Sequence, residues 1–285
     1  LGIYFLLIWM RYSLEEQKIN IEDKLIQFKI LEELNKKQFD EISNCLEEID
    51  LLLKVEDYFL IVEKNYNDLI KFISQNDDKL NKEQLAAFLN ENYLRKLKIE
   101  VNRHILNYLS STRTYIDHVA RLLKKINLSE EFELKISNIY DENFSYRFYS
   151  RLRNYSQHKG IPLTYVSCEV INNDVSKMIY TYDINFLMND YNSWSSVKED
   201  LKKFEGRKLD CLVVSEKYHS NIKEINNFAY SINKKNVKKS IDFLKTILDK
   251  YKNVDRVTLV NELNDKTLKV KLISKEKINT INQLI

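Results

Sequence analysis

An arginine, an asparagine and a histidine lie within the short stretch "RNYSQH", as Arg153, Asn154 and His158. Histidine titrates near neutral pH and can transfer protons, whereas arginine stays charged and offers planar donors that fit phosphate oxygens. Cutting RNA without a metal needs a group that takes the 2′-OH proton and cations that stabilise the charge on the phosphorane. These three residues therefore suit metal-independent chemistry on a phosphodiester, with Asn154 orienting the imidazole or the substrate.

The residues around this stretch carry no negative charge. No carboxylate occurs from Asn143 to Cys168, although 42 of the 285 residues are acidic. A face without carboxylates favours the binding of phosphates that flank the reacting one. The residues that we expect to bind substrate there are Arg147, Arg151, Tyr155 and Gln157.

The aromatic residues of the same segment allow two interpretations. Tyr146, Tyr149 and Tyr155 have rings that could stack on bases, which needs no sequence preference. They could equally pack the protein core, which is the role that we expect for Phe144 and Phe148.

Residues 144–158 are predicted to form one helix that positions these groups. Apolar residues recur at steps of four, four and three, and a polar stripe runs beside them. Gly160 can end the helix and Pro162 cannot continue it, which places His158 in the last turn. The apolar stripe is Phe144, Phe148, Leu152 and Tyr155, and the polar stripe is Arg147, Arg151, Asn154 and His158.

The stretch Arg153–His158 resembles the R-x(4–6)-H signature of HEPN domains, which are helical bundles that include many bacterial ribonucleases. A polar residue, often asparagine, follows the arginine in this family, as Asn154 does here. The resemblance covers roughly residues 81–162. It implies metal-independent cleavage of RNA by attack of the 2′-OH, a homodimer in which two motifs face one cleft, and a role as a toxin or phage-defence effector.

A second stretch, "RTYIDH", has the same spacing between Arg113 and His118. It lies inside a long predicted helix, has threonine after its arginine and contains Asp117. We therefore treat Arg113, Asp117 and His118 as secondary candidates, and we expect His118 to lie on a helix surface or to bond between helices. Spacing alone does not decide between the two stretches.

The fold class expected is mainly α: a HEPN-like helical bundle preceded by long helices and followed by a smaller α+β region. Apolar residues at helical spacing predict long helices over 12–74, and "NKEQ" at 81–84 fits a capping box that starts a helix reaching about Lys125. The expected domains are residues 11–80, residues 81–162 and residues 163–285.

The second half is expected to mix strands and helices. "PLTYVSCEV" and "KMIYTYDI" are rich in β-branched and aromatic residues and predict strands. Helices are predicted for "SWSSVKEDLKKF", for about 209–230 and for 235–251, and a hairpin is predicted around "NDK" near residue 265. His104 and His219 have no partner at metal-binding spacing and are expected on the surface or in the core, and Trp194 is expected to pack.

Composition excludes several classes of protein. With three glycines and one proline, the chain holds no phosphate-cradling glycine loop, and zinc-hydrolase and serine-hydrolase motifs are absent, so we expect no cofactor and no metal. Three widely spaced cysteines favour a reduced, cytoplasmic chain.

The first ten residues, "LGIYFLLIWM", are too few for a membrane span. We expect no stable membrane insertion, with Met10 a plausible start and a weak anchor as the alternative.

Together these features predict an endoribonuclease that acts as a homodimer on RNA, with an antitoxin or regulatory protein as a further partner. The alternative is a non-catalytic helical module, in which the basic helix docks RNA or protein.

Overall fold

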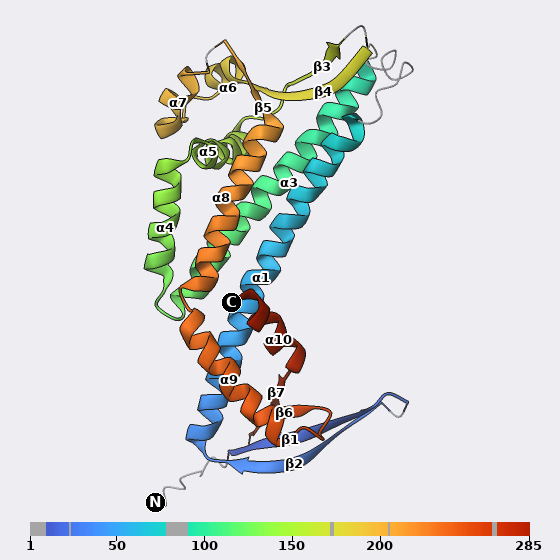
Figure 1. Ribbon diagram of the computed structural model, residues 1–285, viewed down its shortest axis with the longest axis vertical. Coiled ribbons are helices and arrows are strands. Elements are labelled where there is room, and N and C mark those ends of the chain that lie inside the picture. The colour runs from blue at the N-terminus through green and yellow to red at the C-terminus, as the bar shows by residue number, and fades with distance from the viewer. Residues whose placement is uncertain (1–9, 23, 78–90, 172–173, 205, 264–266) are drawn as a thin grey trace, which may run out of the picture. The chain divides into compact units, whose positions relative to one another are not determined.

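The computed structural model describes residues 10–22, 24–77, 91–171, 174–204, 206–263 and 267–285 (Figure 1). It divides into two compact units. One unit comprises the chain up to Lys54 together with Tyr230–Ile285, and the other comprises Val55–Ala229. Two helices, α1 (Lys36–Asp77) and α8 (Cys211–Ser231), have residues in both units. The boundaries expected from the sequence, after residues 80 and 162, both fall inside the second unit.

The first unit contains an antiparallel sheet that joins the two ends of the chain. Its strand order is β2-β1-β6-β7, so the N-terminal hairpin pairs with the C-terminal hairpin through β1 and β6. Leu14 on β1 lies directly opposite Leu259 on β6, and both are buried. The strands are β1 (Arg11–Asn20), β2 (Leu25–Leu34), β6 (Val257–Glu262) and β7 (Leu268–Ile273).

Helices α9 (Lys234–Lys250) and α10 (Lys275–Leu284) complete this unit with the first turns of α1. A reciprocal capping box starts α1: the Gln38 amide donates to Asn35 Oδ1 at 3.0 Å, and the Asn35 amide donates to Gln38 Oε1 at 2.9 Å. Apolar side chains from the helices and the sheet form the buried core. They include Leu14, Ile42, Leu46, Ile49, Ile241, Leu244, Val257, Leu259, Ile273 and Ile281.

The second unit is a helical bundle with a small sheet. Contacts between aromatic residues place α1 antiparallel to α3: Tyr58 meets His118, and Tyr66 meets Tyr108. Tyr108 also contacts His219 on α8. Besides α1 and α8, the helices of this bundle are α3 (Glu91–Lys124), α4 (Ser129–Glu142) and α5 (Phe144–His158).

The small sheet has the antiparallel order β3-β4-β5. Trp194 lies in the connection between β4 and β5, is 1% exposed and donates its indole N–H to the Leu187 carbonyl at 3.0 Å, which confirms its packing role. The elements here are β3 (Tyr165–Ile171), β4 (Asp174–Asp183), α6 (Ile184–Asp190), the 3₁₀ helix η1 (Ser195–Val197), α7 (Lys198–Lys202) and β5 (Lys208–Asp210).

Most predicted elements are confirmed, and the prediction for residues 12–34 is wrong. Strands β1 and β2 of a hairpin lie there instead, because pairing with β6 from the far end of the sequence stabilises strands that local spacing does not reveal. The helical spacing first holds from Phe39 onward, inside α1. The predicted capping box at residues 81–84 lies outside the described residues, and α10 was not predicted.

The fold is mainly α, with two small antiparallel sheets among the described residues. Within that part of the chain, no helix combines the length and the apolar character that crossing a bilayer requires.

Candidate functional site

Helix α5 (Phe144–His158) carries the candidate motif, and its apolar side anchors it in the second unit. Phe148, Leu152 and Tyr155 are buried, while Phe144 is half-buried. The rings of Phe148 and Tyr155 both stack near Trp194, with centroids 6.1 and 6.0 Å away. The predicted helix limits and the apolar stripe are therefore confirmed, and His158 ends the helix as expected.

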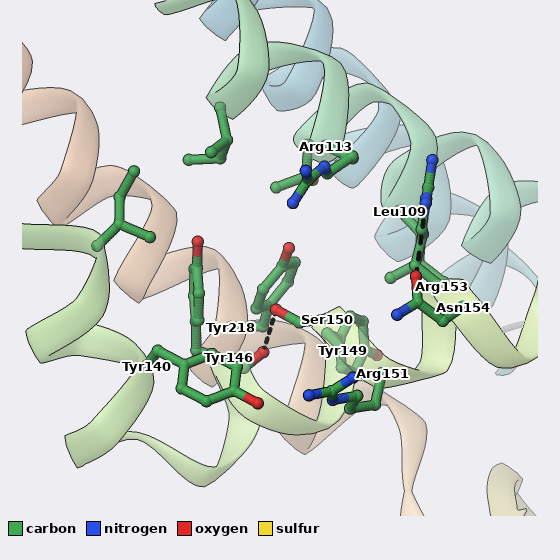
Figure 2. Close-up of a pocket in the computed structure, with 13 residues that line it drawn as sticks. Leu109, Arg113, Tyr140, Tyr146, Tyr149, Ser150, Arg151, Arg153, Asn154 and Tyr218 are labelled. Atoms are coloured by element: carbon green, nitrogen blue, oxygen red, sulfur yellow. Dashed lines mark hydrogen bonds between the residues drawn. The ribbon is translucent and has the colours of Figure 1, made fainter. Parts of the chain in front are cut away.

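A cavity of about 290 Å³ lies beside α5 and collects arginines from two helices (Figure 2). Arg113 comes from α3, and Arg151, Arg153 and Asn154 come from α5. Figure 2 shows these side chains around the cavity together with tyrosines of α4, α5 and α8. The remaining lining residues are Leu109, Thr112, Ile116, Ile136, Tyr140, Tyr146, Tyr149, Ser150 and Tyr218.

The arginines of the cavity are only partly neutralised. Arg113 Nε donates to Asp117 Oδ2 at 2.9 Å, which is an exposed pair within one helix. Arg153 Nη1 reaches Asn154 Oδ1 at 3.5 Å, and its buried Nε has no hydrogen-bond partner among the described residues. Arg151 makes no ion pair with any residue that the structure describes. The cavity thus presents positive charge and free donors, which suits a phosphate or another anion.

The histidines of the two R-x(4–6)-H stretches do not line this cavity. His158 is exposed and lies one helical turn beyond Asn154 on the same face of α5. Arg153 and His158 are about 140° apart around the helix axis. His118 Nδ1 lies 2.9 Å from the Tyr58 hydroxyl on α1, which confirms an interhelical role. The structure therefore brings together the arginines of both stretches and neither histidine.

The tyrosines of α5 belong to the core, which decides between the two roles left open for them and corrects the expectation that Tyr155 binds substrate. Tyr146, Tyr149 and Tyr155 are 5%, 0% and 1% exposed. The Tyr155 hydroxyl donates to Asp190 Oδ2 at 2.9 Å. Their rings pack against neighbouring rings, so no base can reach their faces. Burial raises the pKa of Tyr146 and Tyr149 above the ordinary tyrosine value, as it does for Tyr218, so these cavity phenols keep their protons near neutral pH.

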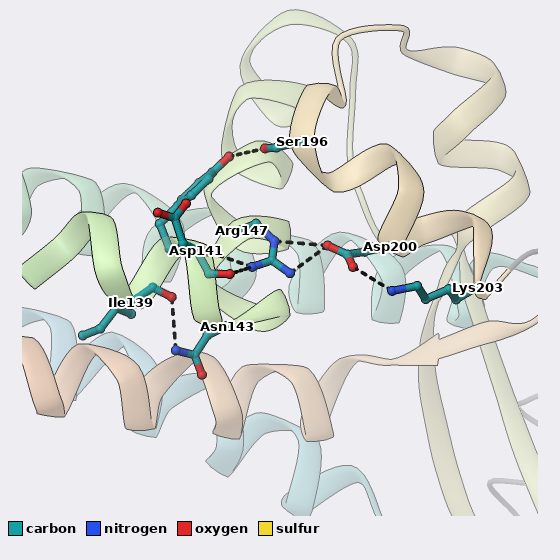
Figure 3. A network of polar contacts seen from close by, with 8 residues as sticks. Ile139, Asp141, Asn143, Arg147, Ser196, Asp200 and Lys203 are labelled. Atoms are coloured by element: carbon teal, nitrogen blue, oxygen red, sulfur yellow. Dashed lines mark hydrogen bonds and ion pairs between the residues drawn. The ribbon is translucent and has the colours of Figure 1, made fainter.

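Arg147 was expected to bind substrate, and the structure gives it a different task (Figure 3). Its Nη2 and Nε donate to Asp200 Oδ2 at 2.8 and 3.1 Å, and its Nη1 donates to the Tyr140 carbonyl at the end of α4 at 2.9 Å. All of its nitrogens are thus engaged in joining α4 and α7 to α5. Gln157 is exposed and lies outside the cavity.

The sequence did not reveal a buried polar cluster around His219. His219 is 4% exposed, and its Nε2 lies 2.9 Å from Glu63 Oε1 while its Nδ1 lies 3.1 Å from the Tyr108 hydroxyl. Tyr66 stacks on the imidazole with centroids 3.7 Å apart. Burial lowers the pKa of His219 to about 4 and outweighs the Glu63 carboxylate, which favours the protonated form. Its partners come from distant parts of the chain, so no sequence motif marks them.

Groups of three or more histidine, cysteine or acidic residues that could hold a metal are absent from the described part of the chain. In comparisons with known proteins, no family model, no curated protein and no solved structure matches this chain. The HEPN resemblance therefore stays a prediction that rests on the motif and its helix.

Proposed function

We propose that this chain is a metal-independent endoribonuclease of the HEPN type, which binds RNA phosphates at the arginine cavity. The convergence of Arg113, Arg151 and Arg153 on one cavity carries this proposal. Like charges held close together repel one another, and a bound anion offsets that repulsion. A phosphate fits this need because guanidinium groups bind its oxygens with two parallel hydrogen bonds.

The proposed reaction uses His158 beside the bound phosphate. A neutral imidazole takes the proton of the 2′-OH, and the 2′-oxygen then attacks phosphorus while the bond to the 5′-oxygen breaks. The leaving oxygen takes a proton from a second, protonated His158, and the products are a 2′,3′-cyclic phosphate and a 5′-OH end. One helix does not focus Arg153 and His158 on the same phosphate, so we propose a homodimer that supplies two copies of the motif.

The resemblance extends the proposal to a biological role. We propose a cytoplasmic toxin or phage-defence effector whose activity an antitoxin or regulatory protein controls. Neither a cofactor nor a metal enters the proposed reaction.

The proposal is tested by cleavage of RNA in excess EDTA. We expect wild type to cut and to leave 2′,3′-cyclic phosphate ends. His158→Ala and Arg153→Ala should lower the rate by about 10²- to 10⁴-fold, as the loss of an acid–base group or a phosphate-binding cation does. Matched controls are His104→Ala and Arg103→Ala, since both residues lie on α3 outside the cavity and should leave the rate unchanged.

Two results would count against this assignment. Loss of activity in His118→Ala together with full activity in His158→Ala would mean that the other motif is catalytic. Equal cleavage by wild type and both α5 variants, with folds confirmed by circular dichroism, would place the reaction elsewhere.

A second candidate function is a non-catalytic RNA-binding module. It is favoured by one observation: no histidine lines the cavity, and the phenols there hold their protons. In that case the protein binds RNA through the three arginines, and wild type does not cut RNA in the assay with excess EDTA.

A further inference from the structure

The β1–β2 hairpin extends beyond the rest of its sheet (Figure 1). Strand β6 pairs with β1 only over Arg11–Glu16, whereas β2 pairs with β1 as far as Asn20. The outer part of the hairpin is thus a two-stranded ribbon. Two-stranded ribbons are marginally stable in water unless one face is covered, so this ribbon is expected to have a partner.

One face of the ribbon is apolar along β2, whereas β1 contributes Ile19 together with Gln17 and Glu15 to the same face. Residues directly opposite each other in an antiparallel pair share a face, and the register sets Ile19 opposite Ile26. Phe28 and Ile30 lie on the same face because they follow at steps of two. Ile19, Ile26 and Ile30 are 44%, 53% and 42% exposed and Phe28 is half-buried, so much of the apolar surface of β2 on this face is open to solvent.

The outer edge of β2 is also unpaired within the described sheet, because β2 is the first strand in the order β2-β1-β6-β7. An exposed edge presents a row of backbone N–H and C=O groups that can pair with another strand. A register shift opposite Leu14 and Glu15 interrupts the regular strand at Leu31. Regular pairing along the outer edge is therefore available over residues 25–30.

The sequence of this edge is complementary to itself. When two copies of "IQFKI" pair antiparallel about Phe28, Phe28 faces its own counterpart and Ile26 faces Ile30. Gln27 then faces Lys29, so no like charges lie directly opposite each other. The two apolar faces also join into one continuous stripe across the pair, because each opposing pair shares a face.

The other edge of the same sheet provides a contrast. Strand β7 contains "LKVKL", which, unlike "IQFKI", reads the same in both directions. Pairing about Val270 would set Lys269 of one copy opposite Lys271 of the other, and like charges opposite each other destabilise a strand pair. Lys271 is moreover bonded to Glu47 at 2.7 Å. Opposed lysines thus disfavour the pairing of two β7 edges, whereas the pairing of two β2 edges brings no like charges opposite each other.

We propose that two copies of this chain associate through their β2 edges, in antiparallel register with a twofold axis at Phe28. Such a contact is isologous: the same surface is used by both copies, and the sheet continues from one into the other. The contact is short, so we expect a weak and reversible dimer. It involves residues of the first unit alone and none of the cavity, and it holds whether or not the chain cleaves RNA.

Disulfide trapping tests the register directly. In Phe28→Cys, the two new thiols face each other across the twofold axis, with Cα atoms about 4.5–5.5 Å apart, which is within disulfide range. Lys29→Cys is the matched control, because its side chain points to the other face and opposes Gln27. Under mild oxidation of the full chain, we expect several-fold more disulfide-linked dimer from Phe28→Cys than from Lys29→Cys or wild type, which carries the native cysteines. Equal yields from the three proteins would overturn the proposal.

A charge pair gives a second test that does not depend on oxidation. Ile26→Lys places a lysine opposite Ile30 of the other copy and should weaken association in sedimentation equilibrium, while leaving any contact between two α5 helices unchanged. Adding Ile30→Glu sets a lysine opposite a glutamate twice and should restore the dimer. Circular dichroism verifies that each variant is folded. Wild type that is monomeric at every concentration, or a double variant as dissociated as Ile26→Lys, would overturn the proposal.

Discussion

Two arginines one helical turn apart on α5 have different tasks. Arg147 bonds to Asp200 and to the end of α4 with all its nitrogens, whereas Arg151 faces the cavity without an ion pair among the described residues. Residue type and spacing made them look equivalent in the sequence. The difference arises from Asp200, which folding brings from more than fifty positions away.

This difference predicts opposite outcomes for two alanine substitutions. Among the described residues, Arg147→Ala leaves the half-buried Asp200 with only Lys203 as an ion-pair partner, so we expect the free energy of unfolding to fall by about 1–3 kcal/mol in urea denaturation. Arg147→Lys should recover little, because an ammonium group cannot span the carboxylate and the carbonyls together. Arg151→Ala should change stability by less than about 0.5 kcal/mol and should weaken RNA binding instead. The reverse pattern would contradict these assignments.

The sequence predicted part of the local structure around the candidate residues correctly. It located the helix, the buried side of α5 and the position of His158, because all of these follow from local spacing. It could not predict that Arg113 joins Arg151 and Arg153, since that depends on how α3 packs against α5. It also left Tyr149 open between two roles, which only its complete burial decides.

Helices α1, α3 and α8 meet at a buried histidine. His219 of α8 lies between Glu63 of α1 and Tyr108 of α3, and Lys223 approaches Glu63 from the next turn at 3.5 Å. Burial keeps His219 neutral in the folded protein, since its pKa falls to about 4 from the usual 6.5. The packing of these three helices buries the His219 imidazole and therefore disfavours its protonation.

The depressed pKa predicts how stability changes with pH. Between about pH 6.5 and pH 4, the unfolded chain binds a proton at His219 that the folded chain does not. The free energy of unfolding should therefore fall as pH decreases through this window, and this contribution should be absent above it. His219→Gln removes the titrating group, so its midpoint in urea should drop less between pH 7 and pH 5 than that of wild type. The same drop in both proteins would show that His219 does not titrate as described.

The sequence predicted those helices and strands that nearby residues in the chain stabilise. Helices α5, α8 and α9 and the β6–β7 hairpin appear close to their predicted limits. The β1–β2 hairpin was not predicted, because β1 is stabilised by pairing with β6, some 245 residues later in the chain. A helical pattern over residues 39–53 was extended too far toward the N-terminus, although the capping box at Asn35 and Gln38 marks where the helix begins.

The two proposed activities, RNA binding and self-association, use residues from different units of the molecule. The cavity lies within Val55–Ala229, and the β2 edge lies in the unit formed by the two ends of the chain. Because the proposals use different residues, substitutions at Phe28 and at Arg153 should act independently on association and on RNA. The division into units follows from the pairing of terminal strands, which no local pattern in the sequence indicates.

The most direct measurement is the affinity of the purified protein for a short RNA whose sugars are 2′-deoxy at every position open to attack. Such a strand binds but cannot be cut, so binding is separated from catalysis. We predict that Arg113→Gln, Arg151→Gln and Arg153→Gln each weaken binding. Each should also reduce the slope of log K against log salt by about 0.7, the value for one lost phosphate contact on a single strand. Arg103→Gln should change neither quantity. Wild-type affinity in the triple variant would contradict the central claim that the cavity binds RNA phosphates.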